Sequence, residues 1–122
     1  MARILVVDDD ISIRALLRSF LEEDGHRVDE AVDGKQGVSQ CLADPVDIVI
    51  TDIIMPEKDG VEFIIELRKS FPCVKIIAMS GGGWGMDAPL GLRLAKAFGA
   101  GHSLEKPLSQ KRVLEAVHLV LN

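Results

Sequence analysis

The sequence lacks the features of membrane-spanning, secreted and nucleic-acid-binding proteins. None of its apolar runs approaches the length that a membrane span needs, and residues 1–4 have no secretory or transit design. Its two cysteines, Cys41 and Cys73, do not have metal-ligand spacing, so we expect two small buried thiols in a reducing cytoplasm. The net charge of −5 leaves no basic stripe to displace counterions. We therefore expect no direct contact with nucleic acid or with a membrane.

The length and composition indicate one domain covering residues 1–122. A chain of 122 residues has no room for two ordinary domains, and 48% hydrophobic residues suffice for one well-filled core. We find no internal repeat, low-complexity tract or linker. The start at Met1 favours a natural N-terminus. The sequence is compatible both with a stand-alone domain and with one domain of a longer protein.

Short apolar runs rich in β-branched residues predict the strands. Three continuous runs are typical of strands that are buried on both faces, as in a parallel sheet covered by helices. Two weaker runs are typical of edge strands. The three continuous runs are residues 4–7, 46–51 and 74–79, and the two weaker runs are residues 26–31 and 102–105.

Apolar residues with helical spacing predict a helix after each strand. The first helix stops at Gly25, the third ends before Pro72, and Ser109 caps the last. The second, on residues 35–43, is weakened by Gly37 and by the preceding Gly34. The residues predicted to face the core are Ile13, Leu16, Leu17, Phe20 and Leu21 in the first helix, Val61, Ile64, Ile65 and Phe71 in the third, Leu90, Leu94, Ala95 and Phe98 in the fourth, and Val113, Leu114, Val117 and Leu121 in the last.

This fivefold alternation of strand and helix predicts an α/β fold. Strands that alternate with helices of this length are joined by right-handed crossovers and form a parallel sheet. With the three most apolar strands in the centre, the strand order is 2-1-3-4-5. We therefore predict a flavodoxin-like, doubly wound five-stranded sheet with helices on both faces.

Four of the predicted strands end in charged or hydroxyl side chains. In an open parallel sheet, functional groups gather at the carboxyl ends of the strands, so we expect these side chains to converge on one crevice. In chain order they are the acidic run 8–10, Asp52, Ser80 and Lys106.

The side chains of this crevice predict a cation and phosphoryl chemistry. Clustered carboxylates repel one another unless a cation lies among them. Oxygen ligands favour Mg²⁺ over zinc, and no Cys or His is placed to compete. A carboxylate beside a divalent ion can attack phosphorus to give an acyl phosphate, while the metal, Lys106 and Ser80 neutralise the phosphoryl oxygens.

The same strand ends carry four short motifs in chain order. They are Val-Val-Asp-Asp-Asp at 6–10, Thr-Asp-Ile-Ile-Met-Pro at 51–56 with Asp-Gly at 59–60, Met-Ser at 79–80, and Lys-Pro at 106–107. Each motif alone has low specificity. Together they extend from the first strand to the last helix, and in this order they resemble the receiver domain of two-component response regulators.

The resemblance implies a role for each matching residue. Asp52 accepts a phosphoryl group from a histidine of a sensor histidine kinase or a histidine phosphotransfer protein. The carboxylates of Asp8, Asp9 and Asp52 hold Mg²⁺ (or Mn²⁺), and the main-chain carbonyl of Ile54 is a further ligand. Lys106 pairs with Asp52 and then with the phosphoryl oxygens. Its bond to the following proline is usually cis in the family.

The resemblance also implies a switch that reaches a downstream protein target. Ser80 turns inward to hydrogen-bond the phosphoryl group. The position three before the lysine commonly holds Tyr or Phe, which moves with it, but here it is Ser103, so we do not expect the usual aromatic relay. Such a domain assists its own phosphorylation, and we expect no conventional enzyme activity.

Two other functions compete with this interpretation. A phosphohydrolase of the haloacid dehalogenase type needs a second aspartate two residues after the nucleophile, where this chain has Ile54. A receiver-like interaction module that acts without phosphorylation stays open because of Ser103. The three histidines, His26, His102 and His118, fall on separate predicted elements, so we expect neither a metal site nor a phosphohistidine among them.

Overall fold

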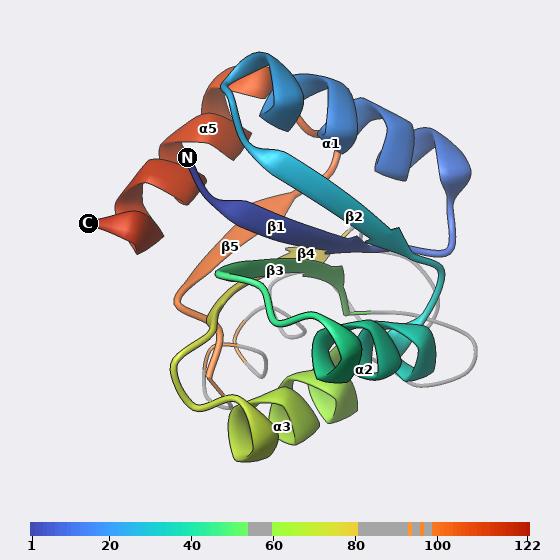
Figure 1. The fold of residues 1–122 in the computed structure, drawn as a ribbon. Coiled ribbons are helices and arrows are strands. Elements are labelled where there is room, and N and C mark those ends of the chain that lie inside the picture. Colours follow the sequence, from blue (N-terminus) through green and yellow to red (C-terminus); the bar gives the residue numbers. More distant parts are fainter. Residues whose placement is uncertain (54–59, 81–92, 94–95, 97–98) are drawn as a thin grey trace.

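The protein forms a parallel five-stranded sheet between layers of helices (Figure 1). The computed structural model describes residues 1–53, 60–80, 93, 96 and 99–122. All strand pairs are parallel and the order is β2-β1-β3-β4-β5, so the predicted flavodoxin-like topology is confirmed. The strands are β1 (Arg3–Val7), β2 (Arg27–Ala31), β3 (Ile48–Asp52), β4 (Lys75–Ser80) and β5 (His102–Glu105).

The helices cover the sheet on both sides, as predicted (Figure 1). Helices α1 and α5 pack on one face, and α2 and α3 pack on the other. Most of the helix predicted on residues 90–98 lies outside the described residues. The bounds are Ile11–Glu23 for α1, Gly34–Ala43 for α2, Gly60–Ser70 for α3 and Gln110–Leu121 for α5.

Alternate residues of the central strands supply two separate cores. In β1, Leu5 and Val7 point to the α2 and α3 side, whereas Ile4 and Val6 point to the α1 and α5 side. All four are fully buried. Both faces of such a strand need apolar side chains, which is why β1, β3 and β4 contain continuous apolar runs in the sequence.

The helical faces agree only in part with the periodicity. Leu17 and Leu21 of α1 are buried as predicted, whereas Leu16 is 37% exposed. In α5, Val113 and Val117 are buried, but Leu121 at the end of the helix is 43% exposed. The prediction for α3 omitted two fully buried residues of that helix, Phe63 and Leu67. Periodicity identifies an apolar face, but the facing sheet decides which residues on it are in contact.

Side chains cap three of the helices. Ser109 accepts a hydrogen bond from the Arg112 amide (3.2 Å) at α5, as predicted, and Asp10 accepts one from the Ser12 amide (2.8 Å) at α1. Asp33 caps α2 in the same way. Gly25, which follows α1, has a φ of +88°, a conformation that side chains rarely adopt.

The two cysteines differ in environment. Cys41 is buried in α2, and burial raises the pKa of its thiol to about 11. Cys73 is exposed, so the prediction of two buried thiols is wrong for this residue, which lies in the turn between α3 and β4. In the described part of the chain, no helix is long and apolar enough to cross a membrane.

Gly37 lies where α2 approaches Phe63 of α3 and Val7 of β1 closely. A Cβ atom there would lie 2.8 Å from Cζ of Phe63 and 3.3 Å from Cγ2 of Val7. Both neighbours are fully buried and cannot move aside easily. The glycine that weakens the helical pattern is thus the residue that lets α2 pack against α3 and β1.

Replacing Gly37 by alanine is therefore expected to destabilise the protein by about 1 kcal/mol. The gain in helix propensity is about 1 kcal/mol, and overpacking a rigid core costs about 1–3 kcal/mol. Urea unfolding measures the difference. In a Phe63→Leu background the same Gly37→Ala change should be neutral or stabilising, and an increase in stability from Gly37→Ala alone would contradict the packing argument.

Candidate functional site

The carboxyl ends of four strands bring the predicted side chains together. Strand β3 ends at Asp52 and β4 at Ser80, while Asp8 and Lys106 directly follow β1 and β5. The Lys106 amide donates a hydrogen bond to the Ser80 carbonyl (2.8 Å), which extends the β4–β5 ladder to the site. The Lys106–Pro107 peptide bond is cis, as the family resemblance implies.

Lys106 lies between two buried carboxylates. Its Nζ donates to Oδ2 of Asp8 (2.9 Å) and to Oδ2 of Asp52 (3.0 Å). The Asp8 side chain is fully buried, that of Asp52 is 8% exposed and that of Lys106 is 19% exposed. One ammonium thus serves two carboxylates, and the site has an excess of negative charge.

The surroundings change the pKa values of two of these groups. Burial raises the pKa of Asp8, and hydrogen bonds from the Asp10 amide and from Lys106 oppose this shift. Burial disfavours the charge on Lys106, but its hydrogen bonds to Asp8 and Asp52 prevail and raise its pKa. Lys106 therefore carries its charge at neutral pH.

A third carboxylate completes an oxygen-rich cluster. Carboxylate oxygens of Asp8, Asp9 and Asp52 lie within 4.8 Å of one another, and Asp9 is exposed whereas the other two are buried. Oxygen ligands that are open to water on one side suit Mg²⁺ or Mn²⁺. The chemistry of the donors therefore fits the predicted ion. The other predicted ligand, the carbonyl of Ile54, lies outside the described residues.

The two serines predicted to form a switch are on adjacent strands. Ser80 is buried at the end of β4, beside Glu105 in the sheet register. Ser103 is half-buried in β5 and is opposite Ala78. The structure thus brings Ser80 to the acidic site and leaves Ser103 two residues further back in the sheet.

The structure adds one residue near the site that the sequence reasoning missed. Arg14 of α1 donates from Nη1 to the main-chain carbonyl of Asp8 (2.8 Å). Arg14 belongs to no motif that would have singled it out in the sequence. The only signal in the sequence is its position one turn into the helix that follows the acidic run.

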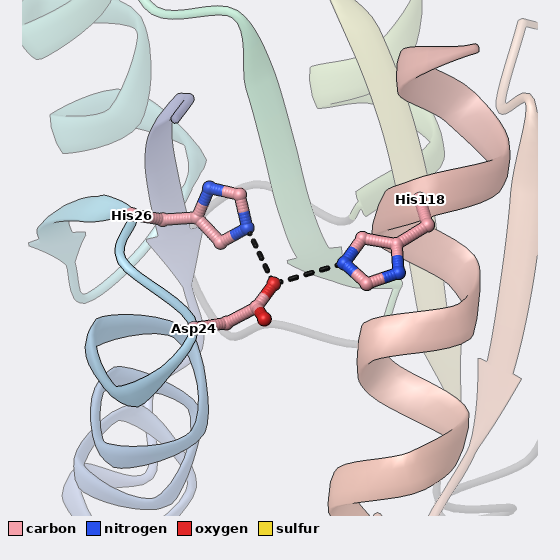
Figure 2. A group of neighbouring side chains, drawn as sticks. All are labelled: Asp24, His26 and His118. Carbon is pink, nitrogen blue, oxygen red and sulfur yellow. Dashed lines mark hydrogen bonds and ion pairs between the residues drawn. The ribbon is translucent and has the colours of Figure 1, made fainter.

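Two of the three histidines lie on separate elements, as expected, but meet at one carboxylate. Figure 2 shows His26 and His118 directed at the same carboxylate, that of Asp24. Each Nε2 lies 2.9 Å from Oδ2 of Asp24. His26 precedes β2 and His118 is in α5, so the tertiary fold, not sequence proximity, joins them.

The hydrogen bonds of His26 favour a structural link over a metal centre. We call this link, formed by Asp24 with His26 and His118, the clasp. The Ala2 amide donates to its Nδ1 (3.0 Å), so in the neutral ring the proton is on Nε2. That Nε2–H donates to Asp24 and has no lone pair for a metal. Asp24 therefore accepts from both rings and connects the end of α1 to α5.

This clasp should contribute to stability at neutral pH and lose its contribution in acid. The hydrogen bond from His118 lowers the pKa of Asp24. Partial burial opposes the shift, and the hydrogen bond from His26 adds to it. A carboxyl whose folded-state pKa is below its unfolded value of about 3.9 stabilises the fold above that value. The contribution disappears as the pH falls through the folded-state pKa.

Replacing Asp24 by asparagine is thus expected to lower the urea midpoint at about pH 6 and to have little effect near pH 2. The exposed Glu115 of α5 provides a matched control, because Glu115→Gln also removes one acidic charge. An effect of Asp24→Asn that stays constant or grows in acid would show that the clasp does not depend on the ionised carboxylate.

The fold and site together define a class of protein. A parallel sheet in the order 2-1-3-4-5 carries three clustered carboxylates and a bridging lysine at its strand ends. The sequence matches the family described as the response regulator receiver domain over residues 4–118. The chain belongs to this family and is a receiver domain of the two-component type.

Individual relatives agree with this assignment. The chain is 34% identical over 121 residues to the transcriptional regulatory protein CpxR of Klebsiella pneumoniae, covering 99% of this chain and 50% of the relative. It is 33% identical over 119 residues to PhoP of Bacillus subtilis, an alkaline phosphatase synthesis transcriptional regulatory protein, covering 98% of this chain and 48% of the relative. The chain therefore spans about half the length of these relatives.

A solved structure has the same architecture. The chemotaxis protein CheY4 of Vibrio cholerae superposes with a TM-score of 0.88 at 30% identity, covering 98% of each chain. The likeness extends over the whole described sheet and its helices.

Proposed function

We propose that Asp52 accepts a phosphoryl group from a phosphohistidine of a sensor histidine kinase or histidine phosphotransfer protein, in the cytoplasm and with Mg²⁺ (or Mn²⁺). The observation that carries this proposal is the bridge from Lys106 to Asp8 and Asp52, beside Asp9. Receiver domains work with histidine kinases and downstream effectors, and the residues of this chain provide the groups that such a transfer needs.

In the proposed reaction, a carboxylate oxygen of Asp52 forms a bond to phosphorus. The bond between phosphorus and the imidazole nitrogen of the donor breaks, and its electron pair remains on the imidazole. The ammonium of Lys106 lies 3.0 Å from this carboxylate, so a positive charge is already placed beside the attacking group. The product is an acyl phosphate on Asp52.

The other residues of the site would bind the cation and neutralise the charge of the phosphoryl group. Asp8, Asp9 and Asp52 would hold the cation, with the carbonyl of Ile54 as a further ligand. When bound, the cation neutralises charge on the phosphoryl oxygens. Lys106 moves its hydrogen bond from Asp52 to a phosphoryl oxygen, and it starts within 3.0 Å of the accepting side chain.

The output of the domain is a change of surface and not a released product. Ser80 is buried at the end of β4, next to the residues that receive the phosphoryl group, and its hydroxyl would hydrogen-bond that group. Ser103 stands where the family commonly has an aromatic residue, so the signal to a downstream protein passes without that ring. Because the phosphoryl group stays on Asp52, the domain is not a conventional enzyme.

Intact-mass spectrometry after incubation with acetyl phosphate and Mg²⁺ tests the proposal. The wild type should gain one phosphoryl group, and neither Asp52→Asn nor the wild type with EDTA should gain any. If the folded protein acquires no adduct and does not bind Mg²⁺, the proposal is wrong, and the domain acts as an interaction module without phosphorylation.

A further inference from the structure

The main chain of Asp8 is held from outside the acidic cluster. Its amide donates to the Ala31 carbonyl (3.2 Å), and its carbonyl accepts from Nη1 of Arg14 (2.8 Å). Its Oδ1 accepts from the Asp10 amide (2.9 Å), which closes the turn that carries Asp9. The orientation of Asp9 thus depends on how firmly Asp8 is fixed.

Arg14 is itself oriented by an ion pair. Its Nε donates to Oε1 of Glu30 in β2 (3.0 Å), and its side chain is only 11% exposed. The main chain of Glu30 is held in turn, because the Gln40 side chain of α2 donates to the main-chain carbonyl of Glu30 (2.7 Å). The planar guanidinium donates to Glu30 from Nε and to Asp8 from Nη1, whereas a lysine at this position would have to reach both acceptors from a single nitrogen atom.

A second arginine shares Glu30 but not Asp8. Arg18, one turn further along α1, donates from Nε to Oε2 of Glu30 (2.6 Å) and from Nη1 to Glu22 (3.0 Å). The two arginines therefore have the same charge, the same helix and the same carboxylate partner. Of the two, Arg14 donates to the Asp8 carbonyl, whereas Arg18 is more exposed and donates to Glu22 instead.

We infer that Arg14, held by Glu30, is a positioning residue that fixes the turn of residues 8–10 for cation binding. The inference rests on the proposed function in that it takes Mg²⁺ as the ion of the acidic site. Partners outside the ligand shell orient the ligands, and their loss weakens metal binding even though they do not contact the metal.

Charge alone predicts the opposite effect. Removal of a positive charge near a cation site strengthens cation binding, because the repulsion between like charges is lost. Loss of positioning weakens it. The sign of the change in affinity therefore distinguishes the two roles of Arg14.

Isothermal titration with Mg²⁺ alone, in the unphosphorylated protein, measures this change. Arg14→Met is expected to raise the dissociation constant about tenfold, and Arg18→Met to leave it within about twofold. Arg14→Lys keeps the charge and should also weaken binding. It provides the same test if Arg14→Met does not fold. Unchanged or tighter binding by the Arg14 variants, or an equal effect of Arg18→Met, would overturn the inference.

Amide hydrogen exchange without metal gives an independent measurement. The Asp10 amide donates to Asp8, so it should exchange faster in the Arg14 variants and at the wild-type rate in Arg18→Met. If the wild type does not bind Mg²⁺, the proposed function fails, and the Asp10 exchange rate still decides the role of Arg14. Equal Asp10 exchange rates in all variants would contradict the inference while leaving the proposed function intact.

Discussion

Replacing Lys106 by methionine is expected to lower the free energy of unfolding by about 3 kcal/mol at neutral pH without divalent cations. The ammonium contacts both Asp8 and Asp52 and is the counter-charge that the described residues place between them. Without it, two carboxylates stay buried close together, so one must take up a proton or the site must open to water. Urea unfolding in EDTA measures the change.

Two further measurements make this expectation specific. Addition of Mg²⁺ should restore part of the lost stability, because a cation replaces the missing charge and binds only the folded form. The exposed Lys111 of α5 provides the control, and Lys111→Met should change stability by less than about 0.5 kcal/mol. A loss below about 1 kcal/mol in Lys106→Met, unaffected by Mg²⁺, would mean that the buried carboxylates do not need this ammonium.

Replacing Asp9 by asparagine is expected to weaken Mg²⁺ binding at least about tenfold while leaving the free energy of unfolding in EDTA nearly unchanged. Asp9 is the exposed member of the cluster, so it costs little to remove from the metal-free fold. As a charged oxygen ligand on the open side of the site, it contributes directly to holding the cation. Calorimetric titration and urea unfolding give the two values.

Asp10 offers a matched control for this variant. It is exposed, it is adjacent to Asp9, and Asp10→Asn makes the same change of charge. Asparagine caps a helix as well as aspartate does, so the cap of α1 is kept. Equal losses of Mg²⁺ affinity in Asp9→Asn and Asp10→Asn would indicate general electrostatic attraction and would contradict a ligand role for Asp9.

Much of the fold follows from local pattern. The continuous apolar runs of β1, β3 and β4 predicted buried central strands because both faces of those strands are covered by helices. The order of the sheet followed from alternation and from which strands were most apolar. The strand-end position of Asp52 and Lys106 was sufficient to predict that they meet, because parallel strands end on the same edge.

Other features depend on which elements face each other. In the sequence, Gly37 only weakens the helical pattern. In the structure, the Phe63 ring of α3 leaves no room for a side chain at this position. Leu16 and Leu121 fit the apolar periodicity but remain exposed, because the sheet contacts only part of each helical face. Periodicity specifies the direction of a side chain around its own helix and contains no information about the shape opposite it.

The polar contacts also divide into those that the sequence predicts and those that depend on tertiary structure. Asp8, Asp9 and Asp52 could be assigned to one site from the sequence, because strand ends converge by topology. The bond from Arg14 to the Asp8 carbonyl and the pairing of His26 with His118 through Asp24 could not, because each needs a distance between side chains from different elements. Residue type and order along the chain therefore determine the fold and the acidic site. The packing of helices against the sheet determines which side chains support that site.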